Sequence, residues 1–132
     1  MISKKHKIVY GSRVLNKKRY KNSNFLSNFR VFGNHVLTLI SNFFNNQKLT
    51  DAHTCYKIFK KDIFKKLNLQ ENDFAFCPEV TTKISLLKEE IIEAPISFKG
   101  RTVKEGKKIK FYDAIRALIT LLKYKYFVNL KF

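Results

Sequence analysis

Glycine and proline are scarce in this sequence, tryptophan is absent, and acidic residues are few. The chain of 132 residues includes 4 Gly, 2 Pro and no Trp. So little Gly and Pro excludes collagen-like and low-complexity chains. The hydrophobic fraction of 45% excludes disorder throughout. A chain of this length predicts a single domain over residues 1–132 with one hydrophobic core.

Cysteines and long apolar runs are scarce as well. Cys55 and Cys77 do not form a C-x-x-C pair, and the basic N-terminus lacks an apolar segment. These features predict a cytoplasmic protein with reduced thiols and no secretion signal. No stretch approaches the roughly 18 uninterrupted apolar residues of a spanning helix, so we expect no such helix.

The shortage of acids leaves a large positive charge. Only 10 Asp and Glu residues oppose 27 Lys and Arg residues, and the formal net charge is +17. Such a chain attracts polyanions, which include nucleic acid, anionic lipid headgroups and phosphorylated substrates. The charge alone does not choose among these partners. The sequence contains no RNA-recognition aromatic motif, phosphate-binding Gly-rich loop or nucleophile elbow.

Apolar residues alternate between strand-like and helix-like spacing along the chain. Strands are predicted at Lys7–Tyr10, Cys55–Phe59 and Ile91–Phe98. Helices are predicted over Phe25–Asn45 and Asp62–Leu67, from Pro78 onward, and over Phe111–Phe127. This order predicts an α/β fold in which a short mixed sheet packs against three main helices.

The apolar side chains of the two longest predicted helices recur at helical spacing, so we expect them to face the core. In the first helix they are Phe25, Phe29, Phe32, Val36, Leu39, Ile40 and Phe43. In the last helix they are Ala114, Ile115, Leu118, Leu121, Leu122 and Tyr126. Cations beside the last helix would also suit contact with an anionic bilayer, but packing against the core is the preferred interpretation.

Polar chemistry is concentrated in the predicted turn Leu49–Thr54. Asp51 could act as a general base or as a ligand, or it could only cap the backbone that follows. His53 and Cys55 are close in sequence, but zinc requires three or four ligands at recognisable spacing. We therefore predict no metal site in this chain.

Separated cations form a second group of candidates. Arg13 follows a strand and a glycine, at the end of the strand where open α/β sheets bind ligands. Arg30 lies at the rim of the long helix's apolar face, either as a phosphate ligand or as a surface charge. The segment Gly100–Lys110 suits either a phosphate clamp or an ordinary solvated loop. Its cations before the final residue are Arg101, Lys104, Lys107 and Lys108.

Four segments carry most of these candidates in a fixed order. They are VYGSR (Val9–Arg13), LTDAHTCYKIF (Leu49–Phe59), FAFCPEVTTKI (Phe74–Ile84) and IIEAPISFKGRTVKEGKKI (Ile91–Ile109). Together they resemble the C-terminal half of a family 2 glycosyltransferase of the polyprenyl-phosphate (dolichol-phosphate) mannosyltransferase type. The resemblance implies part of a GT-A fold, with this chain as the acceptor-side half and the nucleotide-binding half absent.

The resemblance also implies roles for the cations. Arg13 and Arg30 would face a lipid-phosphate acceptor, while Arg101, Lys107 and Lys108 would close over the phosphates. An acceptor phosphate is already a nucleophile, so cationic positioning would supply most of the catalysis.

Three further residues receive roles on the sugar side. Asp51 and Thr54 would line the sugar side of the cleft, and Glu79 would lie at the start of a helix below it. A hydroxyl acceptor would require a carboxylate base, and Asp51 would then be the catalytic candidate.

The sequence lacks the Asp-x-Asp motif that binds the donor's metal in this family. Mg or Mn is therefore expected only with the missing half, and no cofactor is expected for this chain alone. The implied partners are a nucleotide sugar, a lipid-phosphate acceptor, a second chain or homodimer that completes the fold, and the inner face of a membrane as a peripheral contact. One alternative is a basic, non-enzymatic nucleic-acid-binding module, which ranks second because no aromatic stacking surface is predicted. Another alternative is an inactive, truncated remnant.

Overall fold

A three-stranded mixed sheet lies at the centre of the part of the chain that the structure describes. The computed structural model describes residues 5–16, 25–98 and 110–129. Within these residues β1 (Ile8–Ser12) lies between β2 (Lys57–Phe59) and β3 (Ile92–Pro95). β1 is antiparallel to β2 and parallel to β3. The three predicted strands are present, with ends that differ by a few residues.

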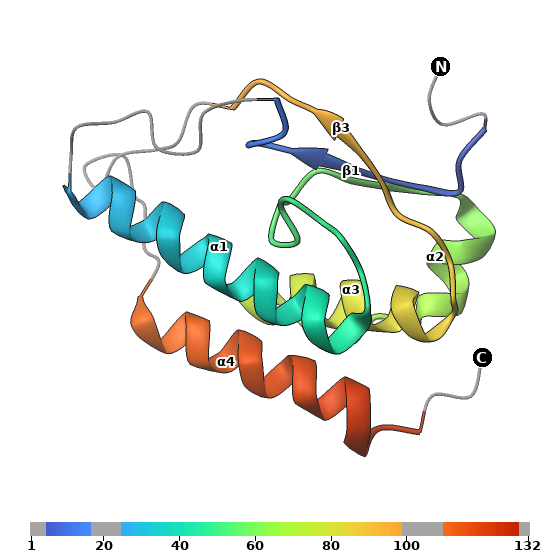
Figure 1. The fold of residues 1–132 in the computed structure, drawn as a ribbon. Helices are drawn as coiled ribbons and strands as arrows, with labels where there is room; N and C mark the ends of the chain where they lie inside the picture. Colours follow the sequence, from blue (N-terminus) through green and yellow to red (C-terminus); the bar gives the residue numbers. More distant parts are fainter. Residues whose placement is uncertain (1–4, 17–24, 99–109, 130–132) are drawn as a thin grey trace.

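Helices cover one side of this sheet (Figure 1). The structure assigns them as α1 (Phe25–Asn45), α2 (Lys61–Leu67), η2 (Asp73–Ala75), α3 (Phe76–Leu86), α4 (Phe111–Leu122) and η4 (Lys123–Phe127), where η2 is a short 3-10 helix and η4 a π-helical turn. α4 packs against both α3 and α1. The predicted α/β class is confirmed. No helix in the described residues is long and apolar enough to cross a membrane.

The apolar core joins β1 to α3. Ile8 and Tyr10 of β1 are fully buried together with Val80 and Ile84 of α3. Each of the aliphatic side chains stabilises the fold by about 1.5–3 kcal/mol through burial. The Tyr10 hydroxyl lies 3.1 Å from the Thr81 hydroxyl, which gives both buried oxygens a hydrogen-bond partner. α3 is thus buried on its polar positions as well as on its apolar face.

The expected orientation of α1 is wrong. Its buried positions are the polar residues Thr38, Ser41 and Asn45, which are at most 3% exposed. Its large apolar side chains point outward instead: Phe29, Phe32, Leu39 and Phe43 are 52–82% exposed. The predicted helical spacing is correct, but the apolar face of α1 does not face the core.

Hydrogen bonds explain why α1 turns its polar face inward. The Thr38 hydroxyl accepts a hydrogen bond from the Ala52 backbone N–H at 3.4 Å. The Asn42 side chain binds both backbone groups of Leu49, donating at 2.8 Å and accepting at 3.0 Å. Asn45 donates to the Thr82 hydroxyl of α3 at 3.2 Å. Buried backbone groups need such partners, and apolar side chains could not supply them.

The expected core stripe of α4 is also wrong in part. Ile115, Leu122 and Tyr126 belong to that stripe but are 38–63% exposed. The positions buried in α4 and η4 are Ala117, Thr120, Leu121 and Tyr124. α4 therefore carries two apolar stripes, one against α3 and one exposed.

The sheet face opposite the helices is apolar and hollowed. Val9 of β1 lies opposite Ile58 of β2 and Ile92 of β3, so their side chains share this face. Gly11 and Ala94 continue the same row toward the ends of their strands. A groove of about 290 Å³ runs along it.

Gly11 is required by close packing on this face. A Cβ atom at Gly11 would meet Ile96 Cγ2 and Tyr56 Cβ at 2.9 Å each. Gly11→Ala should therefore lower the free energy of unfolding by about 1–3 kcal/mol. Gly33 of α1 is the matched control, because nothing lies within 4 Å of its added Cβ. Gly33→Ala should raise the same free energy by about 0.5–1 kcal/mol. Urea unfolding measures both, and equal effects would contradict the packing argument.

Candidate functional site

An arginine and a buried carboxylate meet at the carboxyl end of β1. Arg13 directly follows the strand, and Asp51 lies in the turn after α1. Arg13 Nε donates to Asp51 Oδ2 at 2.7 Å, and Arg13 Nη2 donates to Oδ1 at 2.8 Å. The Arg13 backbone N–H adds a third hydrogen bond at 3.1 Å. This bidentate geometry fixes the guanidinium plane.

Three elements hold the turn that carries Asp51. From α1, the Asn34 side chain donates to Asp51 Oδ1 at 3.3 Å. From β3, the Glu93 carboxylate accepts hydrogen bonds from the backbone N–H groups of Thr50 and Asp51 at 2.9–3.0 Å. From β1, the Ser12 hydroxyl lies 2.7 Å from the Thr50 hydroxyl. The Asp51 carboxylate is therefore held by contacts far apart in sequence.

The electrostatics keep Asp51 ionised. Burial alone would raise the pKa of Asp51, but the hydrogen bonds and charge of Arg13 outweigh burial and lower the pKa. The same pair raises the pKa of Arg13, chiefly through the hydrogen bonds to Asp51. A fully buried carboxylate in this state is a poor general base, because it binds a proton weakly and has no exposed surface. It fixes Arg13.

One side of the Arg13 guanidinium remains open. The Arg13 side chain is 26% exposed, whereas the Asp51 side chain is fully buried. The ring of Phe98, three residues beyond β3, lies 5.3 Å from the guanidinium carbon. Within the described residues, no hydrogen bond reaches Arg13 Nη1. An arginine fixed on one side and open on the other is suited to bind a phosphoryl oxygen.

Of the other predicted cations, one lies on the helix that contacts Asp51 and three lie outside the described residues. Arg30 is on α1, four residues before Asn34, so both lie on the same helix face about 6 Å apart along the axis. Among the described contacts, Arg30 makes no ion pair with Asp51. Arg101, Lys107 and Lys108 lie outside the described residues.

Thr54 is buried within its own turn. Its side chain is fully buried, and its hydroxyl accepts a hydrogen bond from the Tyr56 backbone N–H at 3.2 Å. Its carbonyl accepts hydrogen bonds from Lys57 Nζ and, at 3.7 Å, from Cys77 Sγ. These contacts shape the turn that carries Asp51, and the proposed contact between Thr54 and a sugar stays a prediction.

Glu79 is buried in the first turns of α3. Its carboxylate accepts backbone N–H groups of Gln70 and Glu71 at 2.9 and 2.8 Å. It also pairs with Lys83 at 2.6 Å, and both side chains are at most 1% exposed. Lys83 in turn donates to the Asn68 carbonyl at 2.8 Å. The contacts of Glu79 fasten the loop before α3, while its place below a sugar site stays a prediction.

A buried amine and thiol were not among the predicted site residues. Lys57 Nζ lies 4.5 Å from the centre of the Tyr10 ring and 3.5 Å from Cys77 Sγ. Burial lowers the pKa of Lys57 and raises the pKa of the Cys77 thiol. Cys77 is therefore mostly a neutral thiol at neutral pH and is not an activated nucleophile. In the portion of the chain described, no group of three or more His, Cys, Asp or Glu side chains could hold a metal ion.

Asn34, Glu93 and Phe98, which position the Arg13–Asp51 pair, were also not predicted from the sequence. A glutamate inside the apolar run Ile91–Phe98 was the one visible signal, because a charge in a strand needs a partner.

No family model, curated protein or solved structure matches this chain. The chemistry of the site therefore has to be read from its own residues.

His53, beside Asp51, makes the fold sensitive to acid. Burial, followed by the charge of Lys57, lowers the pKa of His53 from 6.5 to about 4. As the pH falls, the unfolded chain therefore binds a proton first, and stability that is fully present above pH 6.5 is lost between 6.5 and about 4. The loss amounts to at most about 3 kcal/mol.

His53→Gln should remove this part of the acid destabilisation. Urea unfolding of both proteins at several pH values between 7 and 4 measures it. The wild-type free energy of unfolding should fall more steeply with acid than that of the variant. Parallel curves for the two proteins would contradict a neutral His53 in the folded protein.

Proposed function

We propose that this chain supplies the acceptor-side half of a family 2 glycosyltransferase. The half-enzyme would act in glycosyl transfer from a nucleotide sugar to a polyprenyl-phosphate-type acceptor at the cytoplasmic face of a membrane. The observation that carries the proposal is Arg13, fixed by Asp51 and Phe98 with one side open. The order of the four segments that resemble this family adds support.

The position of Arg13 supports an anion site at this edge. β1 and β3 are parallel, so their carboxyl ends meet at the same edge of the sheet. Ligands of open α/β sheets bind at such an edge. The sequence that follows each strand is basic: Lys17, Lys18, Arg19 and Lys21 follow β1, and Lys99, Arg101, Lys104, Lys107 and Lys108 follow β3. A phosphate monoester would bring the matching negative charge.

The state of Asp51 favours a phosphate acceptor over a hydroxyl acceptor. In the proposed reaction a phosphate oxygen forms the new bond to the anomeric carbon, and the bond from that carbon to the nucleoside diphosphate breaks. The leaving group takes the electron pair, and no proton has to be removed from the nucleophile. Asp51, buried and held ionised by Arg13, is then a positioning residue. A hydroxyl acceptor would need a free base, which Asp51 is poorly placed to be.

We assign the donor and its metal to a nucleotide-binding half that these 132 residues do not include. The carboxylates at the Arg13 site are not free to bind a Mg or Mn ion, because Asp51 binds Arg13 and Glu93 binds backbone N–H groups. A divalent ion would therefore come with the nucleotide-binding half. This chain's own contribution is to bind and orient the acceptor.

Replacing Arg13 should weaken acceptor binding specifically. Arg13→Gln removes a charge-assisted hydrogen bond, so the affinity for a soluble short-chain prenyl monophosphate should fall about tenfold or more. Arg116→Gln is the matched control, because it removes the same charge from an exposed site on α4. The control should change the affinity less than about twofold. Titration calorimetry measures both on samples shown to be folded, because Arg13→Gln also leaves the buried Asp51 carboxylate without its partner. Equal losses would show that binding follows net charge alone.

Activity is tested by a transferase assay with nucleotide sugar and polyprenyl phosphate. The assay is run on the folded chain alone and with a co-expressed polypeptide that carries an Asp-x-Asp nucleotide-binding half. We expect turnover only in the second case, and less of it with Arg13→Gln. Absence of turnover in both cases, with the chain folded, would remove the enzymatic proposal.

A further inference from the structure

α1 has an inverted distribution of side chains for a helix that faces water. Its polar residues Thr38, Ser41 and Asn45 are buried, while Phe32 and Phe43 are 53% and 82% exposed. A helix on the surface of a water-soluble protein normally turns its apolar stripe inward. The outward stripe of α1 is continuous over about four turns, so it is not a single misplaced side chain. Such a surface calls for an apolar medium or partner.

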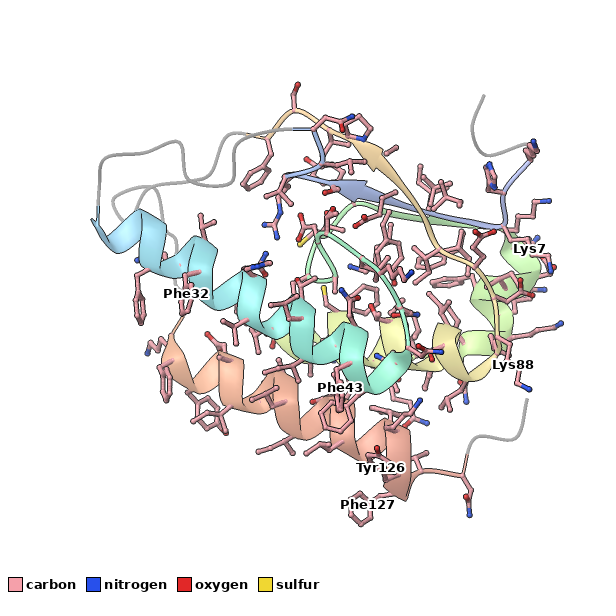
Figure 2. The ribbon with its side chains drawn as sticks, viewed as in Figure 1. Lys7, Phe32, Phe43, Lys88, Tyr126 and Phe127 are labelled. Atoms are coloured by element: carbon pink, nitrogen blue, oxygen red, sulfur yellow. The ribbon has the colours of Figure 1, made fainter. Side chains whose placement is uncertain are left out.

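α4 extends this surface. Figure 2 shows Phe32, Phe43, Tyr126 and Phe127 on the side of the molecule away from the sheet. Phe44 of α1 joins the two helices, because its ring makes edge-to-face contacts with Phe43 at 5.4 Å and with Tyr126 at 6.3 Å. We call the combined surface the aromatic face. Its members are Phe29, Phe32, Leu39, Phe43, Phe111, Tyr112, Ile115, Ile119, Leu122, Tyr126 and Phe127, all 38–84% exposed.

The charges on these helices have nearly one sign. α1 contains no acidic residue, and Asp113 is the only one in α4 and η4. The Asp113 carboxylate is occupied at the helix start, where it accepts the Lys110 backbone N–H at 2.8 Å. The cations on or beside α4 and η4 are Lys110, Arg116, Lys123 and Lys125, of which Lys123 pairs with Glu71 at 2.6 Å. Arg116 follows Tyr112 by four residues and precedes Ile119 by three, so it borders the aromatic face.

We propose that the aromatic face docks on an anionic lipid bilayer, with α1 and α4 lying in the plane of the interface. A bilayer supplies both an apolar layer for the rings and negative headgroups for the cations. A protein partner would need a large apolar patch ringed by acids. A nucleic acid would match the cations but would leave most of the aliphatic side chains in water. This inference rests on the proposed function and adds to it the surface at which the chain would meet a lipid-phosphate acceptor. Docking itself requires no acceptor.

Vesicle binding tests the proposal with two pairs of matched variants. Phe43→Glu with Phe127→Glu places two charges on the aromatic face, at positions 82% and 84% exposed. Ile58→Glu with Phe64→Glu is the control, on β2 and α2, at positions 60% and 52% exposed. Affinity for vesicles of phosphatidylcholine with phosphatidylglycerol should fall at least about tenfold in the first pair and less than about twofold in the control. Pure phosphatidylcholine vesicles should bind the wild type far more weakly, and added salt should weaken binding to the anionic ones.

The absence of tryptophan allows a second measurement that needs no disruptive change. Phe43→Trp and Ile58→Trp each introduce a single indole into a chain that otherwise has none. On anionic vesicles the emission of the Phe43→Trp variant should shift to the blue and be quenched by brominated lipid. The emission of the Ile58→Trp variant should stay unchanged. These two variants keep the proposal testable even if the Glu pair fails to fold.

Three results would overturn the docking proposal. The first is equal loss of vesicle binding in both Glu pairs, and the second is an equal response of the two indole reporters. The third is a blue shift of the Phe43→Trp variant with single-stranded RNA and none with vesicles, which would assign the aromatic face to nucleic acid. All vesicles lack polyprenyl phosphate, so wild-type binding to them tests docking without involving the acceptor site. Failure of the acceptor site therefore remains distinguishable from failure of docking.

Discussion

The buried carboxylate of Asp51 is the group on which the arrangement of the molecule depends. This carboxylate accepts hydrogen bonds from Arg13 after β1 and from Asn34 on α1. The backbone N–H of Asp51 donates to the Glu93 carboxylate of β3. An unpaired charge at a fully buried position would be strongly destabilising, so these partners have to assemble together. The pair therefore connects the carboxyl edge of the sheet, the turn after α1 and the polar side of α1 in one structure. Loss of Arg13 would leave the charge of Asp51 buried without compensation, at a cost of about 3–5 kcal/mol.

The outward apolar face of α1 follows from this polar interior. The turn at residues 49–52 presents polar groups that need hydrogen-bond partners, and α1 supplies them. Asn42 binds the backbone of Leu49, Thr38 accepts from the Ala52 backbone N–H, and Asn34 donates to the Asp51 carboxylate. Since these residues occupy one side of the helix, its phenylalanines are left on the other. In water the exposed rings are unfavourable, because each buried Phe would contribute about 1.5–3 kcal/mol. The exposed apolar face of α1 is thus a consequence of the hydrogen bonds that its polar face makes at the site. Replacing the exposed rings by polar groups would leave those hydrogen bonds unchanged.

The sequence predicted the elements far better than their orientation. The spacing of apolar residues placed α1 at Phe25–Asn45, where the structure has it, whereas β1 continues through Gly11 to Ser12, beyond its predicted end at Tyr10. Local spacing identifies which face of a helix is apolar, but it does not say which medium that face meets. Orientation was decided by contacts between distant residues, such as Thr38 with Ala52 and Glu93 with Thr50. Such contacts join separate segments, so no local pattern around Asn34 or Glu93 could have placed them at the site.

The distribution of acids connects the site with the surface charge. Asp51 and Glu79 are fully buried in ion pairs with Arg13 and Lys83, and Glu93 binds backbone N–H groups. Few carboxylates are then left to offset the lysines on the outside, where most of the net charge of +17 has to be carried. A positive field of this kind attracts any polyanion, so it does not select a partner. In the docking proposal the selection comes from the rings on α1 and α4, because a partner that is both anionic and apolar would cover them and neutralise Arg116 and Lys125 beside them.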